Sequence, residues 1–116
     1  MQVELTAERV AHNQSTFRNT NEELKAAAER LVPEAEKVPF ICECPDPICK
    51  SVTLLTPAEY ETVRSRGDWF LVVPGHEVCV VDGVDVARIE RRHDTFSVME
   101  KVGRAGEQAE QLDPRR

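Results

Sequence analysis

Three cysteines within eight residues constrain this chain more than any other feature of its sequence. Cys42, Cys44 and Cys49 are spaced C-x-C-x4-C, and Pro45 and Pro47 lie between the last two. We expect a strand over residues 40–44, in which positions two apart share a face, so that Cys42 and Cys44 point to one centre. The proline-rich turn can bring Cys49 back to them. The spacing therefore predicts that three sulfur atoms meet at one point.

A metal ion suits such a cluster. Thiols stay reduced in the cytosol, and zinc takes four sulfur or nitrogen ligands in a tetrahedron. His76 is the first candidate for the fourth ligand, because it follows a Pro-Gly break where a loop can be shaped to reach the site. Cys79 is the second candidate and His93 the third. We predict a structural Zn²⁺ site with the ligands Cys42, Cys44, Cys49 and His76.

Two other interpretations of the cysteines stay open. Cys42 and Cys79 lie in apolar runs and could be buried thiols without a ligand role. Cys44 and Cys49 could form a disulfide across the turn if the protein is exported.

The first 34 residues are predicted to form a long helix, from Thr6 to Leu31, that ends before Pro33. Apolar residues recur in it every seven positions, although polar residues interrupt the stripe. Such a helix either packs on its own domain or docks on a partner, which could be a second copy of the chain. The recurring positions are Val10, Phe17, Leu24 and Leu31.

Residues 38–102 are predicted to form a small antiparallel β domain with one short helix. Thr56 can cap that helix, Pro57 suits its first position, and Glu59 can close a capping box, so we expect it to run to Arg66. Further strands are predicted from β-branched or alternating patterns. They cover residues 51–55, 69–73, 77–81, and a hairpin of 86–93 with 96–102 about Asp94-Thr95.

Residues 103–116 are polar and contain glycine and proline, which predicts a loose, flexible tail. The predicted fold class is therefore α+β, with a long N-terminal helix before a zinc-stapled β domain. A part of about 60 residues with few aromatic side chains is small for independent stability, and a structural metal is a common remedy.

Composition narrows the function classes. The formal net charge of −6 opposes binding to nucleic acid through phosphate contacts. The chain contains no run of 18 apolar residues, which a membrane span would need. Met1–Leu5 also lacks the basic start of a signal peptide. We therefore expect a cytoplasmic protein without a membrane partner.

Motifs of known enzyme classes are also missing. His76-Glu77 is not followed by the second histidine of a zinc-protease helix, and neither a phosphate loop nor a dinucleotide fingerprint occurs. Three thiolates and an imidazole would also fill the position that a catalytic zinc keeps open for water. We predict that the chain is not an enzyme.

Three functions are consistent with a stapled domain of this kind. The first is a non-catalytic module, with or without a regulatory role, that binds an unidentified protein partner. The second is nucleic-acid binding in transcription through a local basic strip. The third is a thiol-based redox or metal sensor, because zinc thiolates can be oxidised and release the ion. The basic strip would consist of Arg88, Arg91, Arg92 and Arg104.

The chain resembles a family of short, uncharacterised bacterial proteins. The resemblance rests on FICECPDPIC at 40–49, LTPAEYETVR at 55–64, FLVVPGH at 70–76, RHD at 92–94 and VMEK at 98–101, and it spans roughly residues 17–101. It implies that one unit is formed by Cys42, Cys44, Cys49 and His76, and that Cys79 is not part of this unit. The chain departs from the family at Thr95, where glycine is expected.

Overall fold

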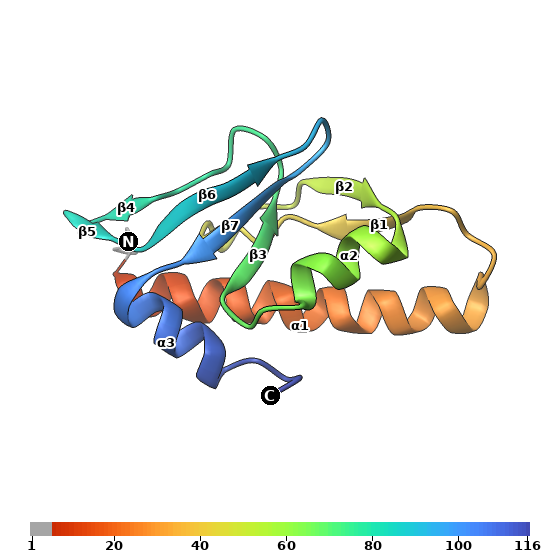
Figure 1. Cartoon of the computed structure of the whole chain (residues 1–116), viewed down its shortest axis with the longest axis horizontal. Coiled ribbons are helices and arrows are strands. Elements are labelled where there is room, and N and C mark those ends of the chain that lie inside the picture. The colour runs from red at the N-terminus through yellow and green to blue at the C-terminus, as the bar shows by residue number, and fades with distance from the viewer. Residues whose placement is uncertain (1–5) are drawn as a thin grey trace.

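The computed structural model describes residues 6–116, so the first five residues of the predicted 1–34 segment lie outside it. It confirms the α+β class, with a long helix along one side of several small antiparallel sheets (Figure 1). The elements, in chain order, are α1 (Ala7–Leu31), β1 (Val38–Ile41), β2 (Val52–Leu55), α2 (Pro57–Arg64), β3 (Trp69–Val72), β4 (Val80–Val81), β5 (Val84–Asp85), β6 (Ala87–Arg92), β7 (Ser97–Lys101) and α3 (Gly103–Gln111).

The largest sheet has three antiparallel strands in the order β3-β7-β6. Phe70 lies opposite Met99 and Leu71 opposite Val98, so the two pairs point to opposite faces. The β6–β7 hairpin forms as expected, and the His93 N–H closes its turn on the Phe96 carbonyl at 2.8 Å. The other sheets have two strands each, β1-β2 and β4-β5. The predicted strand at 77–81 is shorter than expected and comprises only Val80–Val81.

Each face of the central sheet covers its own core. The first, which we call the cysteine core, contains Val10, Cys42, Cys44, Val72, Val81, Val86, Ala87, Met99 and Ala105. The second, the aromatic core, contains Val38, Phe40, Leu55, Tyr60, Val63, Leu71, Phe96 and Val98. In the aromatic core the rings of Phe40 and Tyr60 stack with centroids 4.2 Å apart. Two of the three clustered cysteines therefore belong to the hydrophobic interior.

The buried face of α1 differs from the predicted apolar stripe. Val10 is buried, but Leu31 is 71% exposed. The buried positions after Val10 are mostly polar: Gln14, Ser15, Arg18 and Asn21. These residues recur at helical spacing, so α1 lies on its own domain through hydrogen bonds as much as through apolar contacts.

Arg18 illustrates this packing. Its guanidinium lies 4.5 Å from the centre of the Phe70 ring and donates to the carbonyls of Gly67 at 2.6 Å and Ala109 at 2.8 Å. A buried charge needs such partners, and here they tie α1 to the central sheet and to the end of the chain.

The prediction of a loose tail at 103–116 is wrong for most of its length, because Gly103–Gln111 form α3 against α1 (Figure 1). Ala105 and Ala109, four residues apart, are buried. Gly106 allows close approach, since a Cβ there would lie 2.8 Å from the Lys101 carbonyl oxygen. Small residues gave too weak an apolar pattern to show the helix in the sequence.

The capping box of α2 forms as predicted. The Thr56 hydroxyl accepts from the Glu59 N–H at 3.1 Å, and the Glu59 carboxylate accepts from the Thr56 N–H at 2.8 Å. The helix ends at Arg64, two residues before the expected end. Within residues 6–116, none of the helices is long and apolar enough to cross a membrane.

Replacing the capping residue should weaken the fold measurably. We expect Thr56→Ala to lower the free energy of unfolding by about 1 kcal/mol, because it leaves the first turn of α2 without its hydroxyl acceptor. Urea unfolding followed by circular dichroism measures the change. Thr62→Ala, at an exposed position of the same helix, is the control and should leave stability nearly unchanged. Equal effects of the two variants would contradict the role of the cap.

Candidate metal centre

Two loops bring the predicted ligands together. Cys42 and Cys44 directly follow β1, Cys49 lies farther along the β1–β2 connection, and His76 lies between β3 and β4. One ligand atom from each residue lies within 4.8 Å of all the others. His76 Nδ1 lies 3.7 Å from Cys42 Sγ and 3.5 Å from Cys49 Sγ. The four residues are therefore close enough to hold one metal ion.

The β1–β2 connection turns back as its sequence requires. The Asp46 carboxylate accepts from the Ile48 N–H at 3.0 Å, and the Asp46 carbonyl accepts from the Cys49 N–H at 3.2 Å. Such an aspartate-centred turn suits a segment flanked by prolines. It returns Cys49 to the sulfurs of Cys42 and Cys44. Ile48 is left projecting into solvent at the tip.

A second turn presents His76. The His76 N–H donates to the Val73 carbonyl at 2.9 Å, and Gly75 between them has φ +94°. Proline followed by a glycine of positive φ is the pattern of a type II turn. Glu77 supports the turn by accepting from the Gly75 N–H at 2.8 Å. The Pro-Gly turn thus fixes the backbone position from which the His76 imidazole projects.

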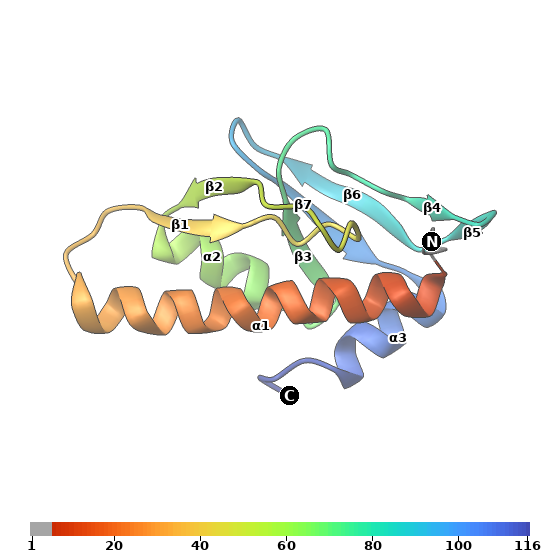
Figure 2. The same cartoon turned by 180° about the vertical axis from the view of Figure 1, so that it is seen from behind.

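Asn21 of α1 holds the cysteine segment in place. Its side chain donates to the Ile41 carbonyl and accepts from the Ile41 N–H, both at 2.9 Å, as a neighbouring strand would. It also donates to the Glu43 carboxylate at 2.8 Å. Two more side chains of α1 bind carbonyls farther along the segment, at 2.8 and 2.9 Å. These are Asn13, which binds Pro45, and Gln14, which binds Glu43. The segment lies along the N-terminal half of α1 (Figure 2).

Glu43, between the two cysteines, is fully buried and joins the segment to β3. Its N–H donates to the Leu71 carbonyl at 2.9 Å, and its carboxylate accepts from the Leu71 N–H at 3.0 Å. Burial raises the pKa of Glu43 to about 7, against the hydrogen bonds from Asn21 and Leu71. Sequence reasoning did not identify Asn21 or Glu43 as supporting residues. For Asn21, the available signal was the group of polar residues that interrupts the apolar stripe of α1.

The thiols of Cys42 and Cys44 shift each other's pKa in opposite directions. The hydrogen bond between the two thiols is the main cause that lowers the pKa of Cys44, to about 5, and the same bond raises the pKa of Cys42. His76 and the Asp46 N–H also favour the Cys44 thiolate. Cys42 Sγ in turn accepts from the Val73 N–H at 3.2 Å. These surroundings thus favour a thiolate at Cys44.

The two reserve candidates for the fourth ligand are not in this cluster. The Cys79 carbonyl accepts from the Val86 N–H at 2.8 Å, at the base of the β4–β5 hairpin. The His93 ring stacks on Phe96 with centroids 4.3 Å apart. All four cysteines of the chain are free thiols in the structure, including Cys44 and Cys49.

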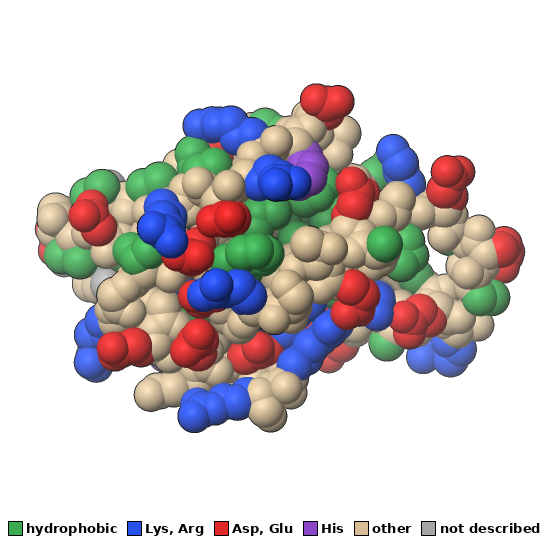
Figure 3. All heavy atoms as spheres, viewed as in Figure 1, with side chains coloured by type: hydrophobic (Ala, Val, Ile, Leu, Met, Phe, Trp, Pro, Cys, Tyr) green, Lys and Arg blue, Asp and Glu red, His purple; other side chains and the backbone are tan. Residues whose placement is uncertain are grey.

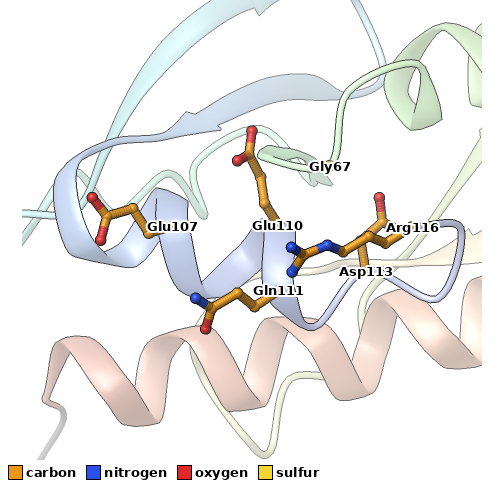
Figure 4. Close-up of a pocket in the computed structure, with 6 residues that line it drawn as sticks. All are labelled: Gly67, Glu107, Glu110, Gln111, Asp113 and Arg116. Atoms are coloured by element: carbon orange, nitrogen blue, oxygen red, sulfur yellow. The ribbon is translucent and has the colours of Figure 1, made fainter.

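The surface has one hollow beside the site and another away from it. One, of about 290 Å³, lies beside the candidate ligands and is lined by Cys44, Pro45, Asp46, His76 and Val78. A larger one, of about 430 Å³, lies along α3 and is lined by Gly67, Glu107, Glu110, Gln111, Asp113 and Arg116 (Figure 4). None of the four candidate ligands lines the larger hollow, so its chemistry is separate from that of the cluster.

Comparison of the chain with protein-family models, with curated proteins and with solved structures gave no match. The resemblance to a bacterial family therefore stays a prediction.

Removing the Asn21 amide should loosen the cysteine segment. We expect Asn21→Ala to lower the free energy of unfolding by about 2–3 kcal/mol, because buried groups of Ile41 and Glu43 lose their partner. Chemical unfolding of the protein measures this loss. Asn19→Ala, an exposed position on the same helix, is the matched control and should be nearly neutral. A loss below about 1 kcal/mol for Asn21→Ala would contradict the anchoring role.

Proposed function

We propose that the chain is a non-catalytic zinc-binding module that acts through contacts with a protein partner. The spacing of the ligand atoms carries the zinc part of the proposal. With zinc–sulfur and zinc–nitrogen bonds of about 2.3 and 2.0 Å, a tetrahedron separates sulfur from nitrogen by about 3.5 Å. The separations between His76 Nδ1 and the sulfurs of Cys42 and Cys49 are 3.7 and 3.5 Å. These two separations therefore match a zinc tetrahedron, and all four ligand atoms lie within 4.8 Å of one another.

The ligand types support the same ion. Three thiolates and one imidazole favour a soft or borderline cation, and zinc binds such sets in closed structural sites. With four protein ligands no coordination position is left for water or substrate, which supports a structural role over a catalytic one. Zinc would join the β1–β2 connection to the loop before β4. Both loops adjoin sheets of only two strands, which are marginal on their own.

Interaction with a protein is supported by the surface around this site. Ile48, Val52 and Leu54 are exposed on the loop and strand that zinc would hold in place. Val52 and Leu54, two apart on β2, share a face of the strand, and contiguous exposed aliphatic side chains often mark protein contacts. Docking through the heptad positions of α1, including self-association, has less support, because Val10 is buried and Phe17 and Leu24 are partly covered.

Nucleic-acid binding through the arginines of β6 has less support still. Arg88 pairs with Glu100 at 2.6 Å, and Arg92 pairs with Glu77 at 3.0 Å. Acidic and basic side chains are also intermixed on the face shown in Figure 3. Such neutralised arginines leave little of the basic strip that phosphate contacts need. The cytosol, where thiols stay reduced, is the proposed location.

Metal analysis tests the zinc proposal directly. We expect the purified protein to hold one zinc per chain by elemental analysis, and the Cys49→Ser variant to hold much less. Cys79→Ser is the matched control, because Cys79 lies outside the cluster, and it should keep the full zinc content. Protein without tightly bound zinc, or equal loss in both variants, would overturn the proposal.

Zinc affinity should depend on pH in a defined direction. Because the pKa of Cys42 is raised, its thiol is protonated at neutral pH and must lose that proton when zinc binds. Cys44, with a pKa of about 5, is already a thiolate at neutral pH. We expect the affinity to rise at least about tenfold per pH unit between pH 6 and 8, measured by competition with a chromophoric chelator. An affinity that does not change with pH would contradict this assignment.

A further inference from the structure

Lys101 is a buried lysine without a hydrogen-bonding partner. Only 2% of the residue is exposed, and its Nζ has no acceptor among the described residues. The closest compensating contact is the Phe70 ring, whose centre lies 5.8 Å from Nζ. A buried ammonium group normally pairs with an anion, because leaving water is costly. The position therefore requires an explanation.

The sheet places Lys101 in the cysteine core. Lys101 and Met99 are two apart on β7 and so share a face, and Met99 packs in one core with Cys42 and Cys44. Ala87, directly opposite Lys101 on β6, belongs to the same core. The Coulombic interactions that raise the pKa of the Lys101 ammonium, against the effect of burial, come from Cys79 and Cys44.

Carboxylates on neighbouring elements are committed to other partners. Glu100 lies on the opposite face of β7. Asp68 contacts Lys101 only through its backbone carbonyl, which accepts the Lys101 N–H at 2.7 Å. Glu43 faces α1 and β3. Their side chains bind, in the same order, Arg88, Arg66 and the Asn21 amide. The anion that balances Lys101 is therefore not a carboxylate.

The charge of the metal centre supplies that anion. Three thiolates contribute −3, a neutral imidazole contributes nothing and Zn²⁺ contributes +2, so a centre with these ligands carries a net charge of −1. We propose that Lys101 is the buried counter-charge of this centre and strengthens metal binding without contacting the ion. The inference rests on the proposed function, since it assigns Lys101 a role toward the same site.

This arrangement has opposite consequences with and without metal. Without metal, the lysine is a buried cation in an apolar core, and burial lowers its pKa to about 7. With metal, the net negative centre stabilises the ammonium, and by reciprocity the ammonium stabilises the bound metal. Removing the charge should therefore help the metal-free protein and weaken metal binding.

Lys101→Met tests this, because methionine is of similar length and carries no charge. We expect its zinc affinity, measured by chelator competition, to fall about tenfold. We expect the urea midpoint of its metal-free form to stay the same or rise. Lys37→Met, at an exposed position, is the control and should leave zinc affinity unchanged. Zinc affinity of Lys101→Met within twofold of wild type would overturn the inference.

Two further measurements separate the alternatives. In a Cys79→Ser background, Lys101→Met should lower zinc affinity by the same factor, and a vanished effect would assign the lysine to Cys79 instead. In the wild-type protein, NMR of the Lys101 side chain reports its charge without any variant. The zinc-loaded protein should keep the ammonium at pH 8.5, whereas a neutral amine there would overturn the inference. Failure of wild type to bind zinc would overturn the proposed function itself.

Discussion

The hydrogen bonds between the Asn21 amide and the cysteine segment are the contact on which the site depends. They give the edge of β1 the backbone partners that it would otherwise find in another strand. The same amide holds the Glu43 carboxylate, which in turn binds the backbone of β3. One side chain of α1 thus fixes the spacing between the two loops that carry the candidate ligands. This role accounts for the polar residues on the buried face of α1.

That arrangement explains why the interior of this protein is unusually polar. The segment that carries Cys42 and Cys44 leaves β1 and satisfies only part of its backbone with other backbone groups, such as the Glu43 N–H on the Leu71 carbonyl. Side chains of α1 bind carbonyls that remain, because buried backbone groups need partners. Buried polar groups contribute specificity only when nearly all are paired. Here Asn21 and Glu43 pair with backbone groups and with each other. Several buried side-chain atoms of the described residues lack a partner, and among them Lys101 Nζ is an entire charged group rather than one atom of a bonded guanidinium such as that of Arg18. A buried charge without a hydrogen bond, next to such a network, indicates that it is balanced by a charge that it does not contact directly.

The fold was predictable where local chemistry decides it. The Thr56 cap, the β6–β7 hairpin and the convergence of three cysteines with His76 all follow from short patterns. The sequence could not show that the polar side of α1 faces inward, because burial of Gln14 and Arg18 depends on distant backbone groups. The α3 helix escaped notice because alanine and glycine carry little hydrophobic signal. Long-range polar pairing cannot be deduced from the periodicity of apolar residues.

The contacts of Arg18 have a consequence for biosynthesis. Its guanidinium binds the carbonyl of Ala109, 91 positions along the chain. Segments of a nascent chain emerge in order from the N-terminus and begin to fold as they do so. Arg18 can therefore reach this partner only after residue 109 has been synthesised and has emerged from the ribosome. Until then α3 is not in place, and the interior that it covers next to Ala105 is open to solvent.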